Sequence, residues 1–354
     1  MRLSECSEIP SNRTRSRIPG SFGRSSFPFA FVVIVLGMLV ASTSCRAQQQ
    51  ELKQPPPLGR MIDVGGRKLH LYCTGSGSPT VILVAGGGAF SVDWALVQQK
   101  IAETTRVCSY DRAGLGWSDP GPAEETVEET VSDLHALLQA GREKRPYLLV
   151  GASIGGIFIQ ACQRTYPEEV AGLVFTNSSN RVGMQVKGKM GLLWEFTEAE
   201  LRSAYPLPAS MTKDPAPTRE EDPFDRLPPD LQKVRLSLDI RLWEKSDPAK
   251  AVPDSLLSWR KEFLKEFDET EAGKKPPLGD LSVVVVASDP AATEAERRSR
   301  DGAAARLDFL SSNTVHIEAK GSGHEIHLYQ PATVIQAILR AVTAVRTHTL
   351  LSPH

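Results

Sequence analysis

The sequence predicts an α/β fold in which a mostly parallel sheet is covered by helices on both faces. Short apolar runs alternate with segments of helical periodicity over residues 67–176 and again over residues 283–346. Runs such as 80–84 and 147–150 lack polar alternation, which is typical of strands that are buried on both faces. Three of the runs end in glycine-containing loops, at 85–89, 110–118 and 151–155. Loops at strand ends are where open α/β sheets bind their ligands.

Composition suits a globular protein and argues against a nucleic-acid partner. The chain has 354 residues, of which 41% are hydrophobic, and a net charge of −1. An α/β fold often reaches this size as a single domain. Because the charge is balanced, nothing in it favours binding to nucleic acid or to an anionic surface.

Residues 1–47 predict an export signal or a membrane anchor. Arginines dominate the charges of the first 27 residues, and residues 27–41 are almost wholly apolar. This order is typical of a signal peptide, and Cys45-Arg-Ala47 offers a cleavage site before Gln48. The alternative is an uncleaved anchor, since the uncharged run at 25–44 is long enough to span a bilayer. Either interpretation places the rest of the chain outside the cytoplasm. Residues 48–58 are a proline-rich linker.

The elements of the folded part follow in order. A first core segment at 59–176 begins with a hairpin that forms an antiparallel edge, because Gly65 and Gly66 separate two apolar runs. The expected strands of this segment are 61–64, 67–73, 80–84, 106–110, 147–150 and 171–176. Apolar residues on one face indicate helices at 94–101, 126–140 and 157–163.

The pattern changes at residues 177–279, where prolines and charges are frequent. We expect a helical insertion with helices at 231–244 and 256–267 and with no strand. A second core segment at 280–347 resumes the sheet with strands at 283–287 and 314–318. Helices are expected at 293–310 and at 331–346, the latter with Pro331 in its first turn. Residues 348–354 are a tail.

Ser153 is the candidate nucleophile. The apolar strand 147–150 runs directly into Gly151-Ala-Ser153-Ile-Gly155, and a helix follows. A sharp strand-to-helix turn places its central residue at the tip, and the flanking glycines remove Cβ atoms that would collide. The serine hydroxyl would then lie at a helix N-terminus, where unpaired N–H groups favour negative charge. A glycine-rich turn with a bystander serine is the structural alternative.

A serine nucleophile requires a base and an orienting group. His324 lies in a flexible Gly-Ser-Gly-His-Glu loop just after the strand 314–318, on the same sheet edge as Ser153. His327 is the rival base, whereas His70 lies inside a strand pattern and is expected to serve packing or the surface. Asp289 follows the strand 283–287 and is the candidate acid. The order serine, acid, histidine along the chain agrees with one known triad arrangement.

These residues together resemble the α/β-hydrolase superfamily, in its bacterial esterase-like branch. The resemblance covers residues 67–345 except the insertion, and it rests on the segments 73–79, 107–118, 151–156 and 321–324. It implies an eight-stranded, mostly parallel sheet with a helical cap inserted after the sixth strand. It also implies a Ser–His–acid triad and an oxyanion hole formed by the N–H of Ile154 and an N–H of the loop at Gly86 and Gly87.

The chain departs from the family pattern at three positions. Ala85 stands where a His-Gly pair usually begins, and Ala152 precedes the nucleophile where relatives often have His. Asn177 ends the sixth strand, where many relatives carry Asp. Asp289 therefore remains the expected acid, with Asn177 in an orienting role or another carboxylate as alternatives.

The expected function is that of a serine hydrolase that cleaves an ester or related small-molecule acyl compound through an acyl-enzyme intermediate. The resemblance implies neither a metal nor an organic cofactor. Because fold alone does not prove catalysis, a non-catalytic ligand-binding protein with the same fold is the alternative. Membrane attachment through the N-terminal apolar segment is a further expectation.

Cys73 and Cys108 are a candidate disulfide. In the topology that the resemblance implies, their two strands are neighbours, so a cross-strand bridge fits the geometry. Export would place this pair where disulfides persist. Two buried free thiols are the alternative, and Cys162 is expected to remain free.

Overall fold

The structure is a computed structural model that describes residues 55–121, 126–178, 183–186, 189–192, 216–245, 278–289 and 310–351. The apolar run predicted at 27–41 and the helix predicted at 256–267 lie outside these residues, as does nearly all of the helix predicted at 293–310. Within the described ranges, no helix combines the length and the apolar character that a membrane span requires.

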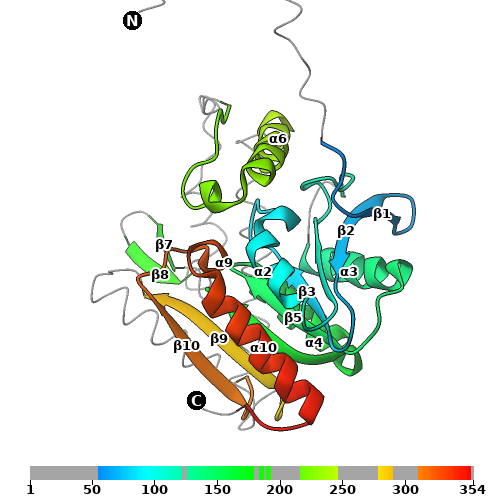
Figure 1. Ribbon diagram of the computed structural model, residues 1–354, viewed down its shortest axis with the longest axis vertical. Helices are drawn as coiled ribbons and strands as arrows, with labels where there is room; N and C mark the ends of the chain where they lie inside the picture. The colour runs from blue at the N-terminus through cyan, green and yellow to red at the C-terminus, as the bar shows by residue number, and fades with distance from the viewer. Residues whose placement is uncertain are drawn as a thin grey trace, which may run out of the picture. The chain divides into compact units, whose positions relative to one another are not determined.

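An eight-stranded sheet organises the described part of the chain (Figure 1). In spatial order its strands are β1 (Arg60–Asp63), β2 (Lys68–Thr74), β4 (Val107–Tyr110), β3 (Thr80–Val84), β5 (Tyr147–Ala152), β6 (Val170–Thr176), β9 (Ser282–Asp289) and β10 (Thr314–Lys320). β2 runs antiparallel to β1 and to β4, and every other neighbouring pair is parallel. The α/β fold class is confirmed, and each strand predicted for the sheet is present.

Helices cover both faces of the sheet. They are η1 (Ser91–Trp94), α2 (Ala95–Ile101), α3 (Val127–Gly141), α4 (Gly155–Thr165), η2 (Pro167–Glu169), α9 (Ile326–Tyr329) and α10 (Pro331–Thr347). Ile82 and Val84 of β3 pack in the core under α3 and α4, whereas Val81 and Leu83 pack under α2 and α10. α10 lies against β9 (Figure 1). Because both of their faces are covered, the central strands β3 and β5 are buried along their whole length and show no polar alternation.

The start of α3 illustrates how the sequence fixes a helix boundary. The Thr126 hydroxyl accepts a hydrogen bond from the Glu129 N–H at 3.1 Å. The Glu129 carboxylate accepts one in return from the Thr126 N–H at 3.0 Å. This capping box satisfies two N–H groups that the first turn would leave unpaired, and the predicted helix at 126–140 is confirmed.

The insertion after β6 contains both helix and strand. The predicted helix at 231–244 is confirmed as α6 (Pro229–Lys245), which follows the short helix η4 (Phe224–Arg226). The expectation of no strand is wrong, because β7 (Gly183–Val186) pairs antiparallel with β8 (Lys189–Leu192). Their sequences, Gly-Met-Gln-Val and Lys-Met-Gly-Leu, contain glycine and polar residues and form no apolar run that would indicate a strand.

One edge of the sheet gathers the loops that carry the candidate site. The strands β3, β5, β6, β9 and β10 are parallel, so their carboxyl ends lie at the same edge. Gly86 follows β3, Ser153 follows β5, Asn177 follows β6 and His324 follows β10. The sheet topology thereby brings together residues that are far apart in the sequence.

Candidate active site

Ser153 occupies a left-handed turn between β5 and α4. Its φ angle is +51°, a conformation that side chains other than glycine rarely adopt. A Cβ atom at Gly155 would lie 2.5 Å from the Val84 carbonyl oxygen, and one at Gly151 would lie 2.6 Å from the Gly155 carbonyl carbon. Both glycines are therefore required for the turn, which has the strand–serine–helix geometry expected of a nucleophile elbow.

Hydrogen bonds fix this turn in its strained conformation. The Ser153 N–H donates to the Thr176 carbonyl at 3.2 Å, which ties the tip to the neighbouring strand β6. The Ser178 hydroxyl donates to the Gly151 carbonyl at 2.6 Å. Because the surrounding contacts determine the backbone here, the serine is held in place while its side chain stays partly exposed.

The loop after β3 lies against the nucleophile. A Cβ atom at Gly86 would lie 3.3 Å from the Ser153 Cβ and 3.9 Å from its Oγ. Gly87 follows in the same loop, and Ile154 is the N-cap of α4, next to the serine. Of the predicted oxyanion residues, Gly86 is thus next to Ser153 in space and Ile154 next to it in sequence, and Gly87 follows Gly86.

His324 lies on the loop between β10 and α9 and contacts Asn177. The Asn177 Nδ2 is 3.1 Å from the His324 Nδ1 and donates to the His324 carbonyl oxygen at 3.0 Å. Asn177 is itself fixed, because its φ angle is +46° and its N–H donates to the Val286 carbonyl at 2.7 Å. Among the residues considered for orienting His324, Asn177 is the one whose side chain contacts it in the described part of the chain.

Asp289 is the last residue of β9, and its backbone pairs with Lys320 at the end of β10. This position places it at the sheet edge that carries the His324 loop. Its side chain lies outside the described part of the chain, so its role as the acid stays a prediction.

His327 is unsuited to act as the base. Its side chain is 5% exposed and stacks on Trp94 with ring centroids 4.5 Å apart. Burial, with a contribution from the nearby His324, lowers the pKa of His327 to about 3. A ring that stays neutral and enclosed cannot exchange protons with a substrate, which leaves His324 as the candidate.

The glycine-rich loop after β4 is organised by a buried aspartate. Asp111 accepts a hydrogen bond from the Ser91 N–H at 2.6 Å and from the Trp117 N–H at 3.2 Å, and it contacts the His70 Nδ1 at 2.9 Å. A Cβ atom at Gly116 would lie 2.3 Å from this carboxylate. His70 is fully buried here, so of the two roles expected for it, packing or the surface, the surface role is wrong.

Sequence reasoning missed two arginines that hold the site together. Arg112 follows Asp111 in the same loop and donates to main-chain carbonyls of the loop beside Ser153. Arg235 of α6 lies between Asp93 and Glu220, at 2.8 Å from each carboxylate. Neither role is marked in the sequence, because Arg235 is one of several charged residues in α6 and Arg112 directly follows another charged residue, Asp111.

The Arg235 cluster joins the insertion to the core. Arg235 is 5% exposed and Asp93 is fully buried in η1. Burial raises the pKa of Asp93 to about 6, although the Arg235 guanidinium pulls it down. Burial also raises the pKa of Glu220. The cluster therefore fastens α6 above the loop that follows β3.

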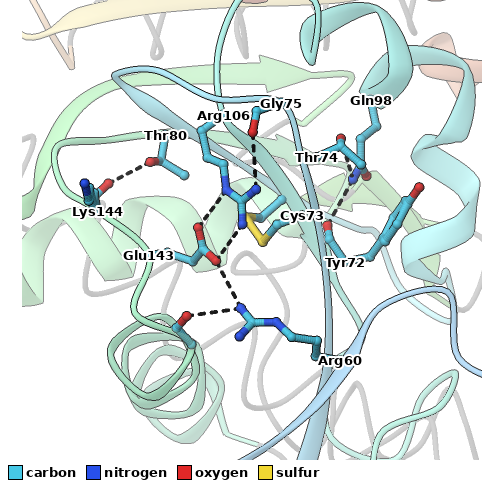
Figure 2. The surroundings of a disulfide bond; sticks show 12 residues. Arg60, Tyr72, Cys73, Thr74, Gly75, Thr80, Gln98, Arg106, Glu143 and Lys144 are labelled. Atoms are coloured by element: carbon cyan, nitrogen blue, oxygen red, sulfur yellow. Dashed lines mark hydrogen bonds and ion pairs between the residues drawn. A yellow bond between two sulfur atoms is a disulfide. The ribbon is translucent and has the colours of Figure 1, made fainter.

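Cys73 and Cys108 form a disulfide across β2 and β4 (Figure 2). They are directly opposite in the antiparallel register, and this is the pair singled out from the sequence. In the surroundings of the bridge, Arg106 makes a two-pronged contact to Glu143 at 2.9 Å and 2.9 Å and donates to the Gly75 carbonyl at 3.2 Å (Figure 2).

Cys162 of α4 is free and buried, as expected. Burial, with a smaller contribution from Glu169, raises the pKa of its thiol to about 12. The thiol therefore stays protonated and unreactive in the folded protein.

Comparison with known proteins identifies a family. A family model described as the alpha/beta hydrolase family matches residues 81–337, more than half of the 354 residues. The uncharacterised protein YqjL of Bacillus subtilis is 33% identical over 102 residues, which cover 28% of this chain and 40% of that protein. A 2-hydroxymuconate semialdehyde hydrolase of Pseudomonas is 29% identical over 152 residues, which cover 42% of this chain and 53% of that enzyme.

A solved structure agrees in fold. A thermophilic esterase from Thermogutta terrifontis superposes with a TM-score of 0.55 at 21% identity, over 80% of this chain and 97% of that one. The chain spans between 18% and 53% of the length of five curated relatives that it matches. Similarity at these levels shows the fold of the chain, and it does not transfer the activities of the relatives to this protein.

Proposed function

Since this chain belongs to the alpha/beta hydrolase family, we propose that it is a serine hydrolase that cleaves an ester or a related small acyl compound. The observation that carries the proposal is the left-handed Ser153, with φ +51°, at a strand-to-helix turn beside Gly86. A strained backbone that exposes a hydroxyl at a helix N-terminus serves no packing purpose. His324, at the same sheet edge, supplies the base that a serine nucleophile needs.

The proposed reaction has two halves. The Ser153 Oγ attacks the substrate carbonyl carbon and its proton passes to His324. The oxyanion is held by the N–H of Ile154 and by N–H groups at Gly86 and Gly87, and preorganised donors of this kind are a large part of catalysis in acyl transfer. The tetrahedral intermediate expels an alcohol, which takes the proton from His324. Water then attacks the acyl-enzyme by the same route, and the acid and Ser153 are released.

The group that orients His324 in catalysis must accept a hydrogen bond from the ring Nδ1–H. When the Asn177 Nδ2 donates to Nδ1, the ring proton lies on Nε2, and neither ring nitrogen keeps a free lone pair for the serine proton. A carboxylate that accepts a hydrogen bond from Nδ1–H keeps the ring proton on Nδ1 and leaves the lone pair on Nε2 free for the serine proton. We therefore keep Asp289 as the proposed acid and assign to Asn177 the role of holding the histidine loop through the His324 carbonyl.

An activity-based fluorophosphonate probe tests the proposal on the purified protein. We expect covalent labelling of wild-type protein at Ser153, located by peptide mass spectrometry. The control is His324→Gln, which should fold equally well and label far more slowly because the serine loses its base. Wild-type protein that is folded but unlabelled would reject the hydrolase and favour the ligand-binding alternative.

We also propose that the folded part acts outside the cytoplasm, exported by or anchored through the segment at 1–47. Support comes from the basic and apolar order of that segment and from the disulfide between Cys73 and Cys108, since disulfides are rare in the cytosol. Fractionation of cells that produce the full chain tests this, and recovery only in the cytosolic fraction would reject it.

A further inference from the structure

Arg112 is a buried cation that contacts the backbone beside the nucleophile. Only 6% of the residue is exposed. Its Nη1 donates to the Ala85 carbonyl oxygen at 2.7 Å, and its Nη2 donates to the Gly86 carbonyl oxygen at 2.9 Å. The two prongs of one guanidinium therefore hold two consecutive carbonyl groups of the loop after β3.

These two carbonyls belong to the peptide groups that carry the proposed oxyanion donors. The carbonyl of Ala85 and the N–H of Gly86 share one planar peptide group, and the carbonyl of Gly86 and the N–H of Gly87 share the next. In a trans peptide the N–H points away from the carbonyl oxygen, and neither bond is among the cis peptides of the described residues. By fixing both oxygens, Arg112 fixes the directions of both N–H groups.

The loop whose N–H directions Arg112 fixes lies next to the proposed nucleophile. A Cβ atom at Gly86 would lie 3.3 Å from the Ser153 Cβ, so the fixed peptides lie next to the attacking oxygen. Ala85 carries only a methyl group and cannot anchor the loop with a side-chain hydrogen bond. Arg112 also lies over the Phe158 ring of α4, at 5.0 Å from the ring centroid, which connects the loop to the helix that begins at the nucleophile.

We propose that Arg112 is the positioning residue of the oxyanion hole: its guanidinium fixes and polarises the two peptide groups whose N–H groups receive the developing negative charge. A cation bound to a carbonyl oxygen strengthens the N–H of the same peptide as a donor, because linked hydrogen bonds polarise one another. In a buried site, the positive charge itself also favours the oxyanion. This inference rests on the proposed hydrolase function.

The test compares Arg112→Lys with Arg106→Lys. Lysine keeps the charge but lacks the two-pronged geometry. Arg106 also makes a two-pronged contact, with the Glu143 carboxylate, and bonds the Gly75 carbonyl, but it lies at the opposite end of β4 from the loop beside Ser153. With a p-nitrophenyl ester we expect Arg112→Lys to lower kcat about 10- to 100-fold, below the roughly 10²–10³-fold loss of a whole oxyanion donor. KM should stay within about twofold, because the interaction strengthens only in the transition state.

A second readout separates positioning from folding. Arg112→Ala assayed with added guanidinium ion should regain activity in proportion to the ion concentration, at levels too low to denature the protein, whereas Arg106→Ala should not. Thermal melting of each variant shows the folded fraction. If Arg112→Lys fails to fold, Phe158→Leu serves instead. It removes the ring beneath the guanidinium, and we expect a decrease of a few-fold in kcat at unchanged KM.

The outcomes separate the inference from the proposed function. Wild-type protein that neither hydrolyses esters nor reacts with a fluorophosphonate overturns the proposed function and this inference with it. Active wild-type protein with a folded Arg112→Lys whose kcat is unchanged overturns the inference alone. So does an equal effect of guanidinium on the Arg112→Ala and Arg106→Ala variants, or an unchanged kcat in Phe158→Leu.

Discussion

The side-chain amide of Asn177 lies 3.1 Å from the His324 Nδ1 and 3.0 Å from the His324 carbonyl oxygen. One residue at the end of β6 therefore holds both the ring and the main chain of the proposed base. An amide is neutral, so it can hold an imidazole in position but cannot balance the charge that the ring acquires when it takes the serine proton. The proposed triad consequently needs a carboxylate besides this contact.

The first prediction separates the two candidate orienting residues. Asp289→Asn should lower kcat by roughly 10³–10⁴-fold, because the ring loses both its correct tautomer and its counter-charge. Asn177→Ala should reduce kcat much less, because His324 keeps its acid and loses only a tether. Steady-state kinetics with a p-nitrophenyl ester over a range of pH measures both effects.

The reverse result would move the orienting role to β6. If Asp289→Asn keeps nearly full activity and Asn177→Ala loses it, Asp289 is not the acid. Asn177→Asp then provides a matched variant, since it places a carboxylate where the amide lies. We would expect its kcat to equal or exceed that of the wild type in that case.

The sheet and the elbow could be predicted because their signals are local. Apolar runs such as 80–84 and 147–150 are unfavourable when exposed to water. The glycines at 151 and 155 indicate the turn because a Cβ atom at either position would clash with the backbone. The position of each loop at a strand end then followed from the alternation of strands and helices. The local sequence pattern was therefore sufficient to predict the strands and helices that build the core.

Contacts between distant residues could not be predicted in the same way. Asn177 and His324 are 147 residues apart, and Arg235 and Asp93 are 142 residues apart. Such pairs form because the fold brings distant segments together, and neither local sequence indicates which residue its partner is. The hairpin of β7 and β8 was missed because its strands, Gly-Met-Gln-Val and Lys-Met-Gly-Leu, contain glycine and polar residues and form no apolar run.

A second prediction concerns the cluster that fastens α6 to the core. Arg235→Met should lower the free energy of unfolding by roughly 3–5 kcal/mol at pH 8, because two buried carboxylates lose their cation. The loss should be smaller at pH 5. The pKa of Asp93 is about 6 in the folded protein, above its value in an unfolded chain, and removal of Arg235 raises it further.

The direction of this pH dependence of stability follows from proton binding. A folded state that binds more protons than the unfolded chain loses stability as the pH rises. The contribution of Asp93 to stability is full below about pH 4, the unfolded pKa, and is lost as the pH rises through the folded pKa.

Urea unfolding of the variant and wild type at pH 5 and pH 8 tests this pH dependence. Lys100→Met, which breaks the exposed pair with Glu103, should change stability by less than about 1 kcal/mol. A deficit independent of pH would contradict the account.

A third prediction concerns the bridge between β2 and β4. Alkylation of the denatured, unreduced protein should leave Cys73 and Cys108 unmodified and should modify Cys162, as peptide mapping would show. The bridge closes a loop of 35 residues, so replacing both cysteines with serine should lower the free energy of unfolding by about 2–4 kcal/mol. Cys162→Ser is the control for the loss of a buried thiol. Alkylation at positions 73 and 108 without reductant would rule the bridge out.

The kcat of Ser153→Ala on a p-nitrophenyl ester tests most directly whether Ser153 is the nucleophile. We expect a loss of at least about 10³-fold with an unchanged melting temperature, because loss of a triad member removes the covalent route. Ser312→Ala, at an exposed serine before β10, should keep wild-type activity. A Ser153→Ala protein that retains more than about a tenth of the wild-type kcat would contradict the assignment.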